Sequence, residues 1–307
     1  MVQGNVDHGE VIAILDPSTD DGHDEAIGSG LAPFFVRLHL VRHGETLANV
    51  QNIVLGQGDS PLTDRGVAFA RTAAASNAIN GKGLRYWRAY CSDLPRAHRT
   101  ARIVLGLEDE EGKAVEASDV DLVGDARLRE LAKGAREGHA KRLSEEEALA
   151  ARKRDAGHDE NVLTRVPKLE SIDEAFDRAR QWIDAVVQEA SREYYSSDES
   201  ARDWTDAHGR ETKRKRYDVF ALTHSALIRT MIHKMVDEEL PADHATTGEG
   251  SLSIPNLSRT IIDIHPYESQ PAKQKESGPR VKWVPSLFQL TDVSHLDGPP
   301  PKGPPYL

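Results

Sequence analysis

Two apolar stretches of this chain each run directly into a histidine. The first, FFVRLHLV, covers Phe34–Val41 and is followed by Arg42 and His43, and the second, Tyr217–Thr223, is followed by His224. Short runs rich in Val, Leu and Phe are typical of buried strands. Arginine and histidine are seldom buried unless they have a partner or a task. The ends of these two strands therefore indicate a place in the fold where positive or titratable groups are needed.

Strands and helices alternate along the rest of the sequence. Further strands are expected at Leu84–Cys91, Asp121–Val123, Thr260–Ile264 and Val281–Leu290. This alternation predicts an α/β fold, a three-layer αβα sandwich with a mainly parallel central sheet and helices on both faces. In such sheets ligands bind beyond the carboxyl ends of the strands, where the two histidines lie.

Two helix starts carry local signals of different kinds. Thr63 is a predicted N-cap, and Pro95 stands in the first turn of the next helix, where its missing N–H costs nothing. A later helix is expected over Ala226–Val236. The helix after Thr63 is expected to bury one face, made of Val67, Ala70, Ala74 and Ala78.

Two more helices begin with capping-box spacing. Ser144 is followed by Glu147, and Ser171 by Glu174, so in each pair the side chains can bond each other's backbone N–H. The second of these helices is long. Its buried stripe is expected to contain Ile172, Phe176, Ala179, Ile183 and Val187.

The chain divides into one main domain and several polar additions. Residues 1–33 form a polar N-terminal extension, in which the apolar run Val11–Leu15 is compatible with one extra strand. Residues 34–296 are expected to form the domain, with a surface insertion at 191–216 that shows no periodicity. Residues 297–307 are rich in proline and are expected to be extended.

Composition limits the kinds of partner. The formal net charge of −11 argues against nucleic acid and anionic membranes, although a small anionic substrate remains compatible with local positive charge. The single cysteine, Cys91, excludes an internal disulfide and a cysteine-based zinc site. Neither a signal peptide nor an apolar run of membrane-spanning length is apparent. We therefore expect a cytoplasmic location and leave protein partners open.

Four stretches far apart in the sequence place phosphate-handling groups at strand ends or helix starts. They contain Arg42 with His43, Arg96, Glu130 and His224. Each is weak evidence alone, because helical arginines usually face solvent and single histidines are usually structural. Together, in this order, they match a known pattern.

In that order the stretches resemble the motifs of a known family. Successive motifs of the histidine phosphatase superfamily, the phosphoglycerate-mutase-like group, are similar to LVRHGET (Leu40–Thr46), GQGDSPLTDRG (Gly56–Gly66), SDLPRAHRTA (Ser92–Ala101), RLRELAKGAREG (Arg127–Gly138), THSALIR (Thr223–Arg229) and PNLSRTIIDI (Pro255–Ile264). The likeness spans Val36 to Ile264. Among the branches, the sequence looks most like the TIGAR type of fructose-2,6-bisphosphatase and related broad-specificity phosphatases.

The resemblance implies a phosphatase that acts through a phosphohistidine. His43 would be the nucleophile, because neutral imidazole is available near neutral pH. Arg42 and Arg96 would hold phosphoryl oxygens through forked hydrogen bonds, and His224 would donate to another oxygen. Glu130 would protonate the leaving oxygen and then act as base toward water. We expect no cofactor and no metal.

Further substrate contacts are expected around this group. Asn49 is placed to donate a hydrogen bond, while Gln57 and Gly58 would shape the rim or give backbone contacts. Ser225 stands where the family often has glycine. Its hydroxyl would either contact phosphate or cap the helix that follows.

The segment after Glu130 leaves two questions open. Its basic side chains, Lys133 and Arg136 together with Lys141, would either meet a second phosphate or carboxylate of the substrate or form a solvated loop. Glu137 is near enough in sequence to compete with Glu130 for the role of acid.

The resulting hypothesis is a metal-independent phosphomonoesterase that hydrolyses a small phosphorylated metabolite, such as a sugar phosphate. Mutases of the family usually carry LNERHYG at the acid segment, and LRELAKG in this chain favours hydrolysis instead. A phosphoglycerate-mutase-type phosphotransferase is the alternative within enzymes. A non-catalytic scaffold that binds partners through its polar extensions is the alternative outside them.

Overall fold

The computed structural model describes residues 13–14, 31–76, 79, 85–115, 121–156, 166–196, 204–205, 211–212, 214–236, 252–267, 282–293 and 296. Within these, a seven-stranded sheet has the order β1-β9-β8-β2-β7-β3-β4. Its strands are β1 (Ala13–Ile14), β2 (Phe34–Arg42), β3 (Arg88–Cys91), β4 (Leu122–Gly124), β7 (Lys215–Thr223), β8 (Arg259–Pro266) and β9 (Trp283–Asp292). A small second sheet pairs β5 (Trp204–Thr205) with β6 (Glu211–Thr212).

The sheet is mainly parallel, as the alternation of elements predicts. Strand β2 pairs in parallel with β7, which pairs in parallel with β3 and through it with β4. On the other side of β2, strand β8 is antiparallel to both β2 and β9. The carboxyl ends of β2, β7 and β3 therefore meet at one edge of the sheet.

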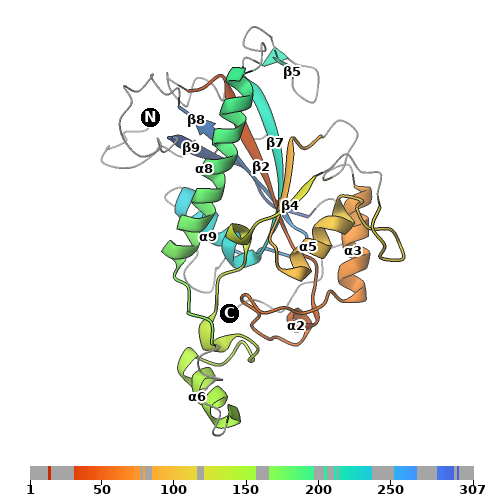
Figure 1. Cartoon of the computed structure of the whole chain (residues 1–307), viewed down its shortest axis with the longest axis vertical. Coiled ribbons are helices and arrows are strands. Elements are labelled where there is room, and N and C mark those ends of the chain that lie inside the picture. Colours follow the sequence, from red (N-terminus) through yellow and green to blue (C-terminus); the bar gives the residue numbers. More distant parts are fainter. Residues whose placement is uncertain are drawn as a thin grey trace.

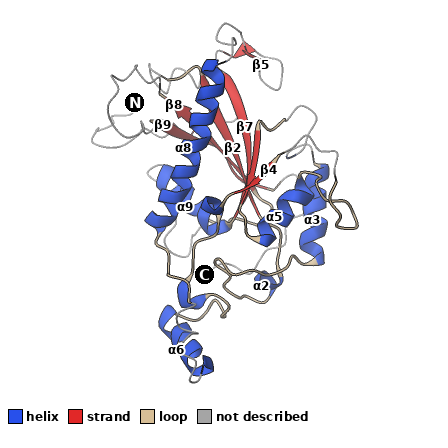
Figure 2. Ribbon diagram, in the orientation of Figure 1, coloured by secondary structure: helices blue, strands red, loops and turns tan. Residues whose placement is uncertain are grey.

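Helices cover both faces of the sheet (Figures 1 and 2). The described helices are α2 (Leu47–Val50), α3 (Asp64–Ala75), α5 (Pro95–Val104), α6 (Glu145–Ala156), α8 (Ile172–Ser196) and α9 (Ser225–Val236), with 3-10 turns η1 (Ala126–Leu128) and η2 (Gly134–Arg136). Helices α8 and α9 pack on one face, against side chains such as Leu38 and Leu40 of β2. Helices α3 and α5 pack on the other face, against Val41, Phe220 and Leu222.

The local helix signals are confirmed. The Thr63 hydroxyl accepts a hydrogen bond from the N–H of Gly66 and caps α3, and Pro95 opens α5. Both capping boxes form: Ser144 exchanges bonds with Glu147 before α6, and Ser171 exchanges bonds with Glu174 before α8.

Three details of the expected elements are wrong. The strand expected at Leu84–Cys91 begins only at Arg88 among the described residues, and Leu84 itself lies outside them. Ile172 is 49% exposed, since the buried stripe of α8 begins one turn later, at Ala175. On α3 the buried position is Ala73 rather than Ala74, and Ala78 lies outside the described residues.

The additions to the domain are only partly described. Residues 191–196, expected in a surface insertion over 191–216, belong to α8, and Lys215 and Arg216 belong to β7. Ala13 and Ile14 form the extra strand β1, which pairs in parallel with β9, while most of the 1–33 extension and all of the 297–307 tail lie outside the described residues.

Helix α6 follows the 3-10 turn η2 and lies apart from the sheet, at the lower end of the view in Figure 1. Its connection to the domain is local: Arg152 donates hydrogen bonds to the main-chain oxygens of Ala135 and Glu137. Among the described helices, none combines the length and the apolar character needed to cross a bilayer.

Candidate active site

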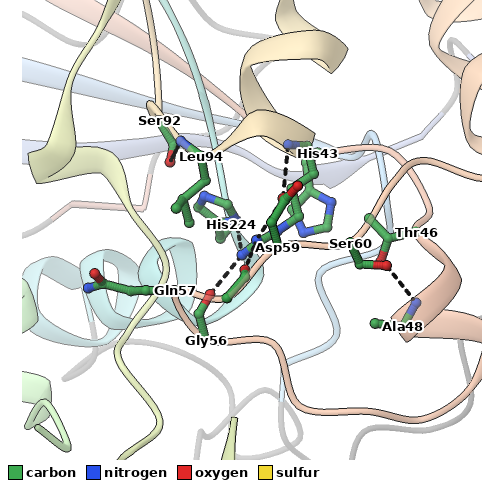
Figure 3. A network of polar contacts seen from close by, with 12 residues as sticks. His43, Thr46, Ala48, Gly56, Gln57, Asp59, Ser60, Ser92, Leu94 and His224 are labelled. Carbon is green, nitrogen blue, oxygen red and sulfur yellow. Dashed lines mark hydrogen bonds and ion pairs between the residues drawn. The ribbon is translucent and has the colours of Figure 1, made fainter. Parts of the chain in front are cut away.

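The strand register brings the two histidines together. Arg42 of β2 pairs with Thr223 of β7, so the residues that follow, His43 and His224, leave the sheet side by side. The N–H of His43 donates to the Thr223 oxygen at 3.0 Å, and the two imidazole ring centroids are 5.1 Å apart. Both side chains are buried, and both lie in the network of Figure 3.

Neighbouring groups indicate which nitrogen of each ring carries the proton. His43 Nδ1 lies 2.7 Å from the Gly44 oxygen, which can only accept, so Nδ1 carries the hydrogen and Nε2 keeps its lone pair. Arg96 can only donate, and its Nη2 lies 3.3 Å from Nδ1 of His224. His224 therefore carries its hydrogen on Nε2, a buried atom without a hydrogen-bond partner among the described residues.

Both histidines are held in the neutral form. Burial lowers the pKa of His43 well below its usual value, and the charges of Arg96 and Arg42 lower it further. Burial also lowers the pKa of His224, with Arg96 as the next cause. A neutral His43 is the form that can act as a nucleophile.

Arg96 is the second cation of the site. It lies at the start of α5, 2% exposed, and its Nη1 and Nη2 donate to the main-chain oxygens of Gly58 (2.6 Å) and Gly56 (2.8 Å). The Asp59 carboxylate lies 3.6 Å from Nη1 and accepts the backbone N–H of Arg96. The loop that carries Gly56 and Asp59 thus packs directly against Arg96, whose guanidinium in turn contacts His224. Gly56, Asp59 and His224 are labelled in the same network in Figure 3.

Arg42 is held by the segment before β8. Its Nη1 donates to the Ile254 oxygen, its backbone oxygen accepts from Leu257 N, and its backbone N–H donates to Ser258 O. Asn256, in the same segment, donates from Nδ2 to the main-chain oxygen of His43 at 2.8 Å. Leu257 has a φ of +61°, a left-handed conformation that a branched side chain seldom adopts.

Glu130 lies beside the start of α9. Its Oε1 accepts the N–H groups of Leu131 (3.0 Å) and Leu227 (3.2 Å), and its Oε2 accepts that of Ala226 (3.2 Å). The side chain is 8% exposed, and its charge raises the pKa of Arg96, which burial otherwise lowers. Glu130 therefore caps the helix that follows His224 and lies in the electrostatic field of Arg96.

The other predicted site residues lie around this group. Asn49 closes a capping box with Thr46, its Oδ1 accepting Thr46 N, so this oxygen serves helix α2. Gln57 Oε1 accepts from Arg129 at 3.4 Å, and Gly58 contacts Arg96 through its oxygen. Ser225 is the first residue of α9 and is half-buried.

The basic segment is partly engaged within itself. Lys133 donates its backbone N–H to Glu137, and the guanidinium of Arg136 donates to the Lys141 oxygen at 3.0 Å. The Lys141 ammonium has a pKa lowered by burial and then by the charges of Arg42 and Arg229, so Lys141 lies nearer the cationic site than its position in the sequence suggests.

Sequence reasoning missed several residues that hold the site in place. Asn256 binds His43, and Thr100 joins Gly44 to the Arg96 oxygen by accepting from one and donating to the other. Glu170 accepts the N–H of Ala132, near Glu130, and is itself held by Arg178. Asn256 and Thr100 stand inside recognised motifs, whereas Glu170 and Arg178 stand in none of them.

Comparison with known proteins gives the same family as the motifs. The family model "Histidine phosphatase superfamily (branch 1)" matches residues 38–196. Among curated relatives, the "Probable phosphoglycerate mutase GpmB" of Escherichia coli and that of Shigella boydii are each 37% identical over 144 residues. These alignments cover 47% of this chain and 59% of each relative, so the chain spans less than two thirds of their length.

Solved structures share the fold at low sequence identity. Bacillus stearothermophilus YhfR gives a TM-score of 0.51 at 22% identity, covering 85% of this chain and 100% of that one. A putative alpha-ribazole-5'-P phosphatase from Escherichia coli gives 0.50 at 20% identity, covering 84% and 96%. These likenesses concern the fold, whereas the family match rests on the sequence. Because the family model matches more than half of the residues of this chain, the chain belongs to the histidine phosphatase superfamily, branch 1.

Proposed function

We propose that this chain is a metal-independent phosphomonoesterase that hydrolyses a small phosphorylated metabolite through a phosphohistidine at His43. The observation that carries the proposal is the pair of assigned tautomers. His43 offers a lone pair on Nε2, His224 offers a hydrogen on Nε2, and the rings are 5.1 Å apart. A nucleophile and a donor for the phosphoryl group thus lie next to each other, and the charges of Arg42 and Arg96 act on both rings.

In the first step His43 Nε2 attacks phosphorus, and the bond from phosphorus to the leaving oxygen breaks. Arg42, Arg96 and His224 Nε2–H stabilise the charge on the phosphoryl oxygens. Glu130 supplies the proton to the leaving oxygen. Among the described residues its Oε2 accepts one hydrogen bond, from Ala226 N, so a second lone pair on that atom can carry this proton.

In the second step water attacks the phosphohistidine. The Glu130 carboxylate takes a proton from the water, the bond from phosphorus to Nε2 breaks, and inorganic phosphate leaves. His43 returns to its neutral form, which its buried and cationic surroundings favour. The cycle then consumes one water and one phosphate monoester.

The main alternative is a phosphoglycerate-mutase-type phosphotransferase. It is supported by the name of the relatives at 37% identity, which describes those proteins as probable phosphoglycerate mutases. A mutase would need a diphosphorylated primer and would keep its phosphoryl group from water. The narrower likeness to the TIGAR type stays a prediction.

Release of phosphate from p-nitrophenyl phosphate in EDTA, without primer, tests the proposal. We expect activity in the wild type and its loss in His43→Ala. Wild-type activity that survives the substitution would contradict the phosphohistidine route. Phosphoryl transfer that occurs only with a primer would favour the mutase, and phosphate binding without turnover of any monoester would favour the scaffold.

A further inference from the structure

The loop Gly56–Gly58 lies between two buried charged side chains. On one side is the guanidinium of Arg96, and on the other is the carboxylate of Glu137, which is 7% exposed. Glu137 Oε1 accepts the N–H of Gln57 at 3.0 Å, and Oε2 accepts that of Gly58 at 3.1 Å. Arg96 donates to the oxygens of Gly56 and Gly58.

One peptide group joins the two charges directly. The oxygen of Gly56 and the N–H of Gln57 belong to the same planar unit, so the N–H points at Glu137 and the carbonyl at Arg96. A carboxylate at one end and a guanidinium at the other both polarise this unit in the same sense, which strengthens each hydrogen bond. The position of the Glu137 carboxylate therefore determines the positions of the loop carbonyls, which in turn orient the guanidinium of Arg96.

The loop backbone fits this arrangement only with glycine at position 56. Gly56 has a φ of +51°, and a Cβ there would lie 2.1 Å from Glu137 Oε1. Glu137 is anchored from behind as well, because Oε1 also accepts the N–H of Lys133 at 2.8 Å. Three backbone N–H groups thus converge on one carboxylate that touches neither histidine in the network described above.

From this geometry we infer that Glu137 is a positioning residue for Arg96, acting through the backbone of Gly56–Gly58, and not a rival of Glu130 for the role of acid. The inference rests on the proposed function only in that Arg96 binds phosphate. It predicts that Glu137 affects phosphate affinity through Arg96 and leaves proton transfer to Glu130.

Equilibrium binding of inorganic phosphate, measured by calorimetry on the full chain, provides the test. Glu137→Gln keeps the size of the side chain but places an amide NH2 against a backbone N–H, so we expect about ten-fold weaker binding. Lysine at position 96 cannot make the paired hydrogen bonds by which Arg96 holds the oxygens of Gly56 and Gly58. In an Arg96→Lys background, Glu137→Gln should therefore change the affinity for phosphate by less than about two-fold. The difference between the two backgrounds measures the coupling.

A second variant, with matched controls, separates the proposed effect of Glu137 from a general folding defect. Gly56→Ala keeps the carboxylate but displaces it, and should weaken phosphate binding by a similar factor of about ten. Gly106→Ala is the matched control, because Gly106 also has a positive φ, +70°, but an added Cβ there would meet nothing within 4 Å. Glu147→Gln, at an exposed position of α6, controls for the change of carboxylate to amide.

Three results would overturn the inference: unchanged phosphate affinity in Glu137→Gln, equal losses in the two backgrounds, or no phosphate binding by the wild type. Failure of the proposed function looks different. In that case the wild type binds phosphate, the coupling between Glu137 and Arg96 remains measurable, and p-nitrophenyl phosphate is not hydrolysed.

Discussion

Asn256 and His43 are 213 positions apart, yet the side-chain amide of Asn256 donates to the main-chain oxygen of His43 at 2.8 Å. Both groups are buried, so the bond fixes the peptide from which the proposed nucleophile projects. Replacing Asn256 would leave that oxygen without its donor. The position of His43 therefore depends on a residue from the segment before β8.

Asn256→Ala should lower kcat/KM for p-nitrophenyl phosphate by about ten-fold or more, because a small displacement of a reacting group is costly. Asn256→Asp is the informative companion, since it keeps the shape and cannot donate to the His43 oxygen. We expect it to be at least as damaging as alanine. An aspartate variant with wild-type activity would show that the amide donor does not matter.

Stability should depend on pH in part through His43 and His224, two of the four buried histidines among the described residues. Their pKa values are lowered in the folded state, so between those values and about 6.5 the unfolded chain binds more protons than the folded one. The stability they confer is complete above about pH 6.5 and is lost as pH falls toward the folded pKa values. The melting temperature of the wild type should therefore be lower at about pH 5.5 than at about pH 7.5.

The double variant His43→Asn with His224→Asn should show a flatter dependence of melting temperature on pH than the wild type over the same range. His98→Asn, on the half-buried surface of α5, serves as the control and should keep the wild-type slope. Equal slopes for the double variant and the wild type would mean that the two histidines are not the groups responsible.

Glu130→Gln should affect substrates according to their leaving group. An alkyl phosphate needs a proton on its leaving oxygen, whereas p-nitrophenolate leaves readily without one. We expect a loss of about 100-fold or more in kcat for the alkyl ester and a much smaller loss for p-nitrophenyl phosphate. Similar losses for both esters would assign Glu130 only the capping of α9 that its bonds to Ala226 and Leu227 show.

Gly66→Ala should destabilise the fold although alanine favours helices. The added Cβ would lie 2.3 Å from the main-chain oxygen of Glu45, a backbone atom that cannot move away cheaply. Helix propensity favours alanine by only about 1 kcal/mol, while overpacking costs about 1–3 kcal/mol. Denaturant unfolding should show a net loss for Gly66→Ala and little change for Gly124→Ala, whose added Cβ meets only ordinary contacts. A stabilised Gly66→Ala would contradict the packing described.

The strands and helices with strong local patterns were predictable. Strands β2 and β7 are largely apolar, and α8 begins at a capping box that the sequence shows plainly. The end of α8 was predicted wrongly, because a tertiary contact determines where this helix ends. The end of α8 looks polar, but Tyr194 stacks on Phe34 with ring centroids 5.4 Å apart, which keeps residues 191–196 in the helix.

In the proposed site, too, the residues that stand in motifs could be predicted and the contacts between them could not. His43, His224, Arg42 and Arg96 stand in motifs, and the structure brings them together at one sheet edge. The tautomers and the contact of Asn256 could not be predicted, because a single amide-to-carbonyl bond leaves no periodic trace in a sequence. The sequence showed Glu137 only as a second candidate for the acid. Its contacts with the N–H groups of the loop become apparent only in the structure.

The position of β2 in the sheet has a consequence for how the chain is made. Strand β2 is synthesised well before its two neighbours, β7 and β8, which begin at Lys215 and Arg259. Until about two hundred further residues have left the ribosome, both edges of an apolar strand lack their native partners, and such edges invite aggregation. Protection of the nascent chain during this interval would then govern its yield, and folding dominated by such distant pairings would be slow.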